Sequence, residues 1–308
     1  MTRAARFSLP TALAAIAALT MALCVPIPAA AQGKATAAAQ SAQAAQAAQS
    51  AENRFAMVKM ADGRLLAPDI ARIINRGELV VSMHGSDNPP FFSTNKKGDL
   101  VGTDVDLSRL IAKELGVVVR FDRSAKTFDA VAEVVAAGQA DLGISRLART
   151  LKRGQMVHFS STYMRLGHAL LINRIRFAEL AGDQPVAQVV RNFTGTISVI
   201  ANSSWEEFGR RNFPNAKLVP FPTWAEAVNA AKTGMVVAAY RDEMEVLQFV
   251  NNDPSLALTL RTVTFSDLES PLSVMVGVRD TTLLSFVNEV IAQRADKPTV
   301  SSVLKSIK

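Results

Sequence analysis

The sequence FDAVAEVVAAGQADLGISR occupies residues 128–146 and predicts a helix followed by a short strand. Thr127 stands where an N-cap hydroxyl would accept a hydrogen bond from the first helical turn, and Gly138 follows the last helical residue. The strand is expected at Asp141–Ile144, with the charged Arg146 just beyond its end. This stretch therefore predicts a helix–strand unit that presents a cation at the carboxyl end of its strand.

A second stretch repeats this layout, because WAEAVNAAKTGMVVAAYRD occupies residues 224–242. Its helix begins with a capping box formed by Thr223 and Glu226, and a glycine separates the helix from the next strand. Asp242 ends this stretch at the position that Arg146 occupies in the first one. Ligands of open α/β sheets bind at the carboxyl ends of strands, so the two units would present opposite charges to one cleft. This arrangement favours a zwitterionic ligand.

The same alternation of strands and helices extends over most of the remaining chain. Strands are expected at 78–83, 117–121, 196–200, 217–220 and 274–278, and helices at 104–115, 204–211, 243–250 and 283–294. Such alternation predicts an α/β fold with a mostly parallel sheet and helices on both of its faces.

The first 31 residues have the layout of an export signal. Arg3 and Arg6 precede an apolar stretch, and small residues lead up to Ala31, where we expect cleavage. The mature protein is then expected in the periplasm. Two alternatives stay open at this point: the segment is retained as an anchor, or Cys24 carries a lipid. Leu23 is larger than the residue that normally precedes a lipidated cysteine.

Composition argues against several classes of function. The only cysteine lies inside the expected signal peptide, so the mature chain has no disulfide and no thiol nucleophile. Its three histidines lack metal-ligand spacing, and we expect neither a metal nor another cofactor. The net charge is +7, but the basic residues are scattered, which disfavours nucleic acid as a partner. Aromatic residues make up only 6% of the chain, which disfavours a sugar-binding cleft.

Four stretches carry a resemblance to a known family: LVGTDVDLSRLIAKELGV (100–117), FDAVAEVVAAGQADLGISRLARTLKRGQMVHFSSTY (128–163), GMVVAAYRDE (234–243) and VMVGVRDTTLLSFVNEVI (274–291). Their order and spacing resemble the family 3 extracytoplasmic solute-binding proteins, the polar amino-acid receptors of ABC importers. The resemblance implies a two-lobed periplasmic-binding-protein fold (type II), each lobe being a mixed, mostly parallel sheet flanked by helices. We expect a signal peptide at 1–31, an Ala/Gln-rich tether and lead-in at 32–68, lobe 1 at 69–165 plus 272–308 and lobe 2 at 166–271, with two hinge crossings near Gly167 and Ser270.

The resemblance also implies a binding site. Arg153, in the family's T-x-x-R pattern, would hold the α-carboxylate of the ligand, and Asp242 would hold its ammonium group, although Asp242 is also placed to cap the following helix. The other candidate ligand-binding residues are Arg146, Ala148, Ser145, Asp87, Phe91, Asn202, Ser203 and Ser204. Ala148 stands where the family usually has a hydroxyl. Arg146 replaces a small residue, and it either adds a cation for a more acidic ligand or projects into solvent.

These observations predict a receptor and not an enzyme. It would capture an amino acid or a related zwitterionic or anionic solute by hinge closure and deliver it to an ABC-importer permease. We expect it to act as a monomer. Two alternatives remain: a dehydratase-like enzyme on the same fold, with Asp87 or Asp242 as the acid, or a ligand sensor for a membrane signalling receptor.

Overall fold

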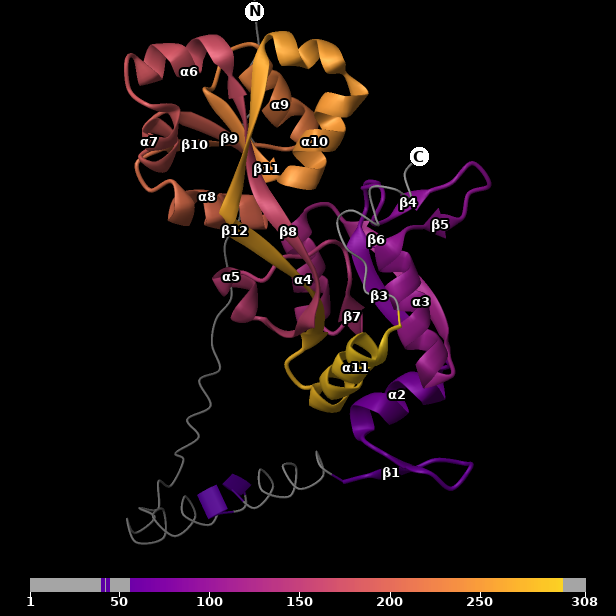
Figure 1. Cartoon of the computed structure of the whole chain (residues 1–308). Helices are drawn as coiled ribbons and strands as arrows, with labels where there is room; N and C mark the ends of the chain where they lie inside the picture. The colour runs from indigo at the N-terminus through magenta and orange to yellow at the C-terminus, as the bar shows by residue number, and fades with distance from the viewer. Residues whose placement is uncertain (1–39, 42, 45–55, 296–308) are drawn as a thin grey trace, which may run out of the picture. The chain divides into compact units, whose positions relative to one another are not determined.

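One large mixed sheet with helices on both faces organises the protein (Figure 1). The structure is a computed structural model that describes residues 40, 41, 43, 44 and 56–295. The strands of the large sheet, in chain order, are β3 (Glu78–His84), β6 (Val118–Ala125), β7 (Leu142–Gly143), β8 (Val157–Asn173), β9 (Thr196–Ile200), β10 (Lys217–Phe221), β11 (Ala238–Asp242) and β12 (Leu260–Gly277). Two small hairpins lie outside it: β1 (Val58–Lys59) with β2 (Leu65–Leu66), and β4 (Ser93–Thr94) with β5 (Leu100–Val101).

The helices connect and cover these strands. They are α2 (Pro68–Arg76), α3 (Thr103–Leu115), α4 (Phe128–Ala136), α5 (Leu151–Gly154), α6 (Arg174–Ala181), α7 (Val186–Arg191), α8 (Ser204–Asn212), α9 (Trp224–Lys232), α10 (Glu243–Asn252), the 3₁₀ helix η1 (Pro254–Leu258) and α11 (Thr281–Gln293). The helices that the sequence predicted are therefore present, with ends that differ by a few residues.

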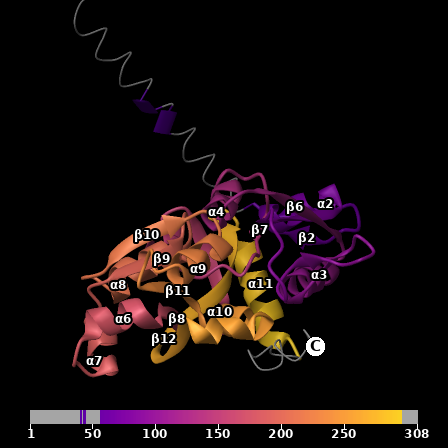
Figure 2. The ribbon, with the colours of Figure 1, turned by 90° about the horizontal axis from the view of Figure 1, so that it is seen from above.

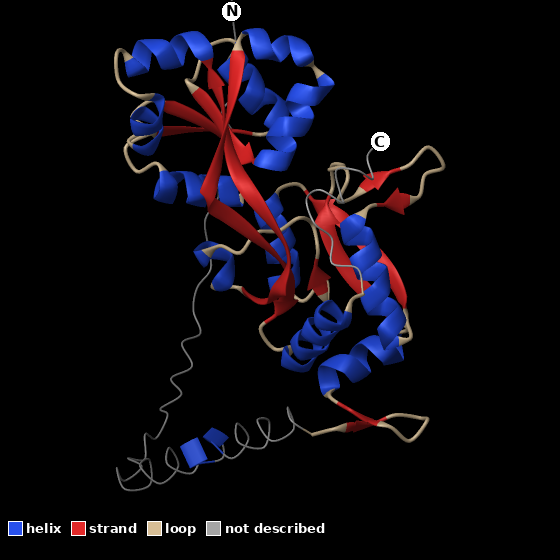
Figure 3. Ribbon diagram, in the orientation of Figure 1, coloured by secondary structure: helices blue, strands red, loops and turns tan. Residues whose placement is uncertain are grey.

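The sheet joins two lobes through its central strands. Its order is β10-β9-β11-β8-β12-β7-β3-β6. The first three strands belong to one lobe and the last three to the other, while β8 and β12 run through both (Figures 1 and 3). Seen from above, the β9–β11 group lies on the opposite side from α2, α3 and β6 (Figure 2). The predicted type II two-lobed α/β fold is confirmed.

The two long strands account for the antiparallel part of the sheet. Pairs within each lobe, such as β3 with β6 and β9 with β10, are parallel, whereas β8 and β12 pair antiparallel with each other and with their outer neighbours. Gly167 pairs with Glu269 and Leu166 with Ser270, so the two predicted crossing points are neighbours in one ladder. The sequence analysis predicted no strand at 157–173, and it predicted only the last part of β12. The lobe boundaries at 165/166 and 271/272 stay a prediction.

Local signals in the sequence explain the ends of several helices. The Thr127 hydroxyl accepts a hydrogen bond from the backbone N–H of Ala130 at 3.1 Å, as predicted. The capping box of Thr223 and Glu226 is present at the start of α9. Gly116 ends α3 with φ of 73°, a left-handed conformation that glycine adopts without a Cβ clash. These caps fix where α4 and α9 begin and where α3 ends.

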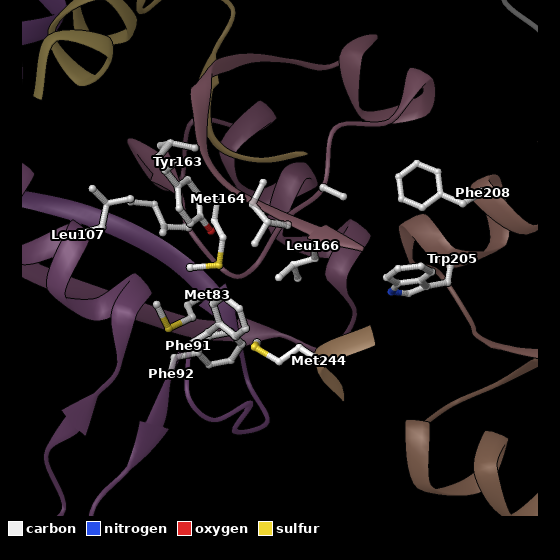
Figure 4. Close-up of a cluster of buried hydrophobic side chains, with 14 of the residues drawn as sticks. Met83, Phe91, Phe92, Leu107, Tyr163, Met164, Leu166, Trp205, Phe208 and Met244 are labelled. Atoms are coloured by element: carbon white, nitrogen blue, oxygen red, sulfur yellow. The ribbon is translucent and has the colours of Figure 1, made fainter. Parts of the chain in front are cut away.

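Buried apolar side chains fill the space between the sheet and its helices. Leu79, Val81 and Leu142 in one lobe and Ile197 and Val199 in the other are all fully buried. Burial of each such side chain contributes roughly 1.5–3 kcal/mol. Figure 4 shows the part of this core beside the lobe junction, where Met244 of α10 points toward Phe91. Apolar packing therefore continues from one lobe to the other next to the candidate site.

The expected signal peptide, its cleavage after Ala31 and most of the Ala/Gln-rich tether lie outside the described residues, so these stay predictions. Within the described part of the chain, none of the helices has the length and apolar character needed to cross a bilayer. The same residues contain no group of three or more histidine, cysteine and acidic side chains that could hold a metal ion.

Candidate functional site

A small cavity lies between the two lobes, where predicted site residues from both sequence halves meet. Its lining is formed by Phe128, Arg146, Ala148, Arg153, Leu166, Ser203, Ser204, Trp205, Arg241, Asp242, Ser270 and Leu272. The side chains leave about 20 Å³ of open space, room for about one water molecule. A solute the size of an amino acid therefore enters only when the lobes or these side chains move apart.

Arg153 lines this cavity and is only 1% exposed. Its Nε donates to Oδ1 of Asp129 at 2.9 Å, and its Nη1 donates to the carbonyl of Ala148 at 2.9 Å. The Thr150 hydroxyl accepts from the Arg153 backbone N–H at 3.2 Å and thereby starts α5. Burial lowers the pKa of Arg153 although Asp129 opposes the shift, and the guanidinium remains charged because its ordinary pKa is so high. Its burial shows that Arg153 is not a surface residue of α5.

Arg146 enters the cavity from the end of the first helix–strand unit. Its φ is 50°, a left-handed conformation, and its backbone N–H donates to Asp104. The guanidinium lies 4.8 Å from the centre of the Phe91 ring and donates from Nη1 to Asn88 Oδ1 at 2.8 Å. It also pairs with Asp242 of the other lobe. With a side chain only 4% exposed, Arg146 does not project into solvent.

Asp242 has two roles in this structure. Its Oδ1 accepts from the backbone N–H of Glu245 at 2.9 Å and so caps α10. The same carboxylate contacts Arg146 across the cleft, and it is 1% exposed. A carboxylate removed from water in this way requires cationic partners, because an unpaired buried charge is very unfavourable.

Two residues of the site were missed by the sequence analysis. Arg241 is 3% exposed, and its Nη2 lies 3.3 Å from Glu245 Oε2. Burial lowers the pKa of Arg241. Burial would raise the pKa of Glu245, but Arg241 and Arg146 outweigh that effect and lower it. Arg241 ends a strand and Glu245 lies in the first turn of the following helix, so the pairing rule for residues on one helix does not apply to them and no sequence signal pairs them.

Hydrogen bonds outside the cavity hold the two lobes together. Glu207 of α8 accepts from the backbone N–H groups of Leu151 at 2.8 Å and Lys152 at 3.2 Å, at the start of α5. The carbonyl of Asn202 accepts from the backbone N–H of Asp129 at 3.1 Å. The structure is therefore a closed form of the cleft.

Some of the other predicted site residues line the cavity and some do not. Ser203 and Ser204 line the cavity, as Ala148 does. Phe91 lies beneath Arg146, and the Ser145 hydroxyl accepts from the His84 backbone N–H at 3.0 Å. Asp87 accepts from Arg123 Nη1 at 2.8 Å and is not among the lining residues. Arg146, Ala148, Arg153, Ser203, Ser204 and Asp242 are thus brought together, whereas Asp87, Phe91, Ser145 and Asn202 are not among the lining residues.

Comparisons with known proteins give a consistent picture. Residues 79–306 match the family described as bacterial extracellular solute-binding proteins, family 3. The L-cystine-binding protein TcyJ of Escherichia coli (strain K12) is 23% identical over 234 residues, which is 75% of this chain and 83% of that protein. ABC transporter arginine-binding protein 1 of the same strain is 22% identical over 208 residues, 66% of this chain and 80% of that protein.

Solved structures agree in fold. AbpA of Streptococcus pneumoniae, an amino acid ABC transporter substrate-binding protein bound to L-arginine, superimposes with a TM-score of 0.61 and 25% identity, covering 77% of this chain and 96% of that one. The ancestral amino acid-binding protein AncCDT-1, a precursor of cyclohexadienyl dehydratase, gives a TM-score of 0.60 and 25% identity, covering 77% and 97%.

Proposed function

Because the chain belongs to the bacterial extracellular solute-binding proteins of family 3, we propose that it is a receptor for an amino acid or a related small zwitterionic or anionic solute. Its task is to capture this solute outside the cytoplasmic membrane and deliver it to an ABC importer. The relatives are named for cystine, arginine and histidine, and these names describe those proteins alone.

One observation carries the proposal: Arg153 and Asp242 come from different lobes and line the same buried cavity. A guanidinium holds a carboxylate through two parallel hydrogen bonds, and a carboxylate is the natural partner of an ammonium group. The pair therefore suits the two charged groups that every α-amino acid carries.

Binding would proceed by hinge closure about β8 and β12. The solute docks on lobe 1 (69–165 plus 272–308) through Arg153, and lobe 2 (166–271) then closes over it with Asp242, Ser203 and Ser204. Closure is favoured because only the closed form makes both sets of contacts. Micromolar affinity requires about −8 kcal/mol, which several charge-assisted hydrogen bonds in a closed cleft can supply.

The remaining parts of the proposal concern the cellular setting. The protein acts in the periplasm after cleavage of its signal peptide, as a monomer, and its closed form is recognised by the permease. We propose that it does not catalyse a reaction. The likeness to a dehydratase precursor makes turnover of prephenate and arogenate the appropriate check, and formation of product from either would replace the receptor by an enzyme.

The test is a thermal-shift screen of the purified protein against the twenty amino acids and common dicarboxylates. A ligand at a hundredfold excess over its Kd stabilises the protein by about 2.7 kcal/mol. Arg153→Ala should abolish the shift, while Arg120→Ala, on the exposed edge of the sheet and 52% exposed, should not. Arg153→Lys keeps a charge for Asp129 and separates loss of binding from loss of folding. No shift with either panel, or an unchanged shift in both Arg153 variants, would contradict the proposal.

A further inference from the structure

The cavity is lined by more cations than anions. Arg146, Arg153 and Arg241 all contribute to its lining and are at most 8% exposed, whereas Asp242 is the one carboxylate among the described lining residues. A buried guanidinium needs a counter-ion close by, since solvent cannot screen its charge. The chain supplies these counter-ions from outside the lining, through Asp129 and Glu245.

Two of the arginines converge on a single oxygen. Oε2 of Glu245 lies 2.6 Å from Nη1 of Arg146 and 3.3 Å from Nη2 of Arg241. Arg146 follows β7 in one lobe and Arg241 lies in β11 of the other, yet the two guanidiniums share this acceptor. Such a geometry is a carboxylate site made of two cations, and in the closed structure a carboxylate of the chain itself occupies it.

Each of these arginines also retains a buried nitrogen without a hydrogen-bond acceptor among the described residues. The atoms are Nη2 of Arg146, Nη2 of Arg153 and Nε of Arg241. They lie near Asp242 or Asp129 as ion pairs, but without hydrogen-bond geometry. Further acceptors brought into the cavity would therefore complete three donors that the protein leaves unsatisfied.

The ammonium group of a ligand changes how the carboxylates and the arginines of the cavity are paired. Asp242 already contacts both Arg146 and Arg241, so an ammonium that binds Asp242 competes with them for its oxygens. A ligand with one carboxylate directs that group to Arg153 and leaves Arg146 and Arg241 with Glu245 as their remaining shared anion. A second carboxylate on the ligand restores the lost pairing. A cationic side chain, as in arginine, adds a further positive charge to the same place.

We propose that the ligand is a dicarboxylic amino acid, with its α-carboxylate on Arg153 and its second carboxylate on Arg146 and Arg241. This inference rests on the proposed function and specifies its substrate class. Arg146 and Arg241 are then the residues that determine specificity, and Glu245 is an internal competitor for the second carboxylate.

Isothermal titration of the purified protein with matched pairs tests this assignment. L-glutamate is compared with L-glutamine and L-aspartate with L-asparagine, because each pair differs in one anionic group. L-arginine and succinate are added as probes of a cationic side chain and of a missing ammonium. We expect one of the acids to bind at least a hundredfold more tightly than its amide, and succinate to bind more weakly than that acid.

Variants identify the residues responsible. Arg241→Gln and Arg146→Gln should each reduce the ratio between acid and amide affinity at least tenfold, whereas Arg120→Gln should leave it unchanged. Glu245→Gln removes the competing carboxylate and should tighten binding of the acid. Since Arg146→Gln disturbs a residue in a left-handed conformation, Arg241→Gln and Glu245→Gln keep the test valid if that variant does not fold.

The outcomes separate this inference from the proposed function. Preferred binding of a neutral or cationic amino acid, or an acid-to-amide ratio that is unaffected by Arg241→Gln and Glu245→Gln, would overturn the dicarboxylic assignment and leave the receptor intact. Absence of binding to all twenty amino acids and to dicarboxylates would overturn both.

Discussion

Arg146 and Asp242 form a buried ion pair that joins the two lobes across the candidate site. They occupy equivalent positions after the two helix–strand units, and each lies at the carboxyl end of its own unit. The repeat in the sequence therefore brings its two charges into direct contact. In the closed form each of these groups has the other as a partner, so a ligand must replace that contact and not merely fill a space.

Asp242→Asn should abolish ligand binding and destabilise the closed protein. Asparagine caps a helix as well as aspartate does, so the start of α10 is preserved. The buried Arg146 and Arg241 lose an anion, and breaking a buried pair costs about 3 kcal/mol or more. Chemical denaturation and calorimetric titration measure the two effects. Asp253→Asn, which alters the cap of η1 away from the cavity, serves as the control. Equal stability of both variants would refute the role given to Asp242.

Glu207→Ala should weaken ligand binding without touching the cavity lining. Glu207 accepts two backbone hydrogen bonds from α5, and these bonds are made between lobes. Their loss disfavours closure by about 1.5 kcal/mol, equivalent to a roughly tenfold increase in Kd. Glu206→Ala is the matched control, because Glu206 accepts hydrogen bonds from Asn202 and Arg210, which belong to its own lobe. If both variants have the same Kd, Glu207 does not stabilise the closed form.

His168 should make the protein less stable in acid. It is buried beside Tyr240 and bonds Ser270 Oγ at 2.7 Å, and burial lowers its pKa to about 4 from 6.5. The unfolded chain then takes up a proton at a higher pH than the native protein does. The stability contributed by neutral His168 is therefore complete above pH 6.5 and is lost as the pH falls toward about 4. Its size is at most about 3 kcal/mol.

The measurement for this prediction is the free energy of unfolding between pH 4 and 7 for the wild type and for His168→Gln. The difference between the two curves should shrink as the pH falls. Parallel curves for the wild type and His168→Gln would show that His168 does not titrate abnormally.

Asp104 should affect the pH dependence of the unfolding free energy in the opposite direction to His168, and Asp104→Asn should remove this effect. Burial raises the pKa of Asp104 to about 7, and its carboxyl group bonds the Tyr163 hydroxyl at 3.0 Å and the Arg146 backbone. The native protein then holds a proton that the unfolded chain releases, so stability falls as the pH rises from about 4 to about 7. Asn cannot titrate, so the unfolding free energy of the variant should lack this decline. A decline of the same size in both proteins would contradict the raised pKa.

Local chemistry made much of the fold predictable. Thr127 and Thr223 predict helix starts because their hydroxyls can cap the first turn, and both caps are present in the structure. The β8 strand was missed because it runs from one lobe into the other with Gly167 in its middle, so neither burial nor alternation is uniform along it. Its partner β12 was recognised only where it lies in the core of lobe 1.

The candidate site was predictable to a smaller extent. Arg146 and Asp242 follow from the repeat, and Arg153 from the family pattern. Arg241 and Glu245 were not found, because their roles depend on where the turn from β11 into α10 directs two side chains from one strand end and one helix. Only the positions in space show that Glu245 accepts from Arg146 of the other lobe as well as from Arg241.

The pairing of Gly167 with Glu269 and of Leu166 with Ser270 has an evolutionary consequence. The lobes are joined by adjacent, hydrogen-bonded strands and not by separate loose linkers, so substitutions along this ladder change how easily the protein bends. Gly167 and Glu269 are not among the lining residues of the cavity, so substitutions at this pair leave the wall unchanged and alter the retention of every solute alike, whereas Leu166 and Ser270 also line it. Two proteins that differ at Gly167 or Glu269 can thus differ in how firmly they retain a solute without differing in which solute they bind.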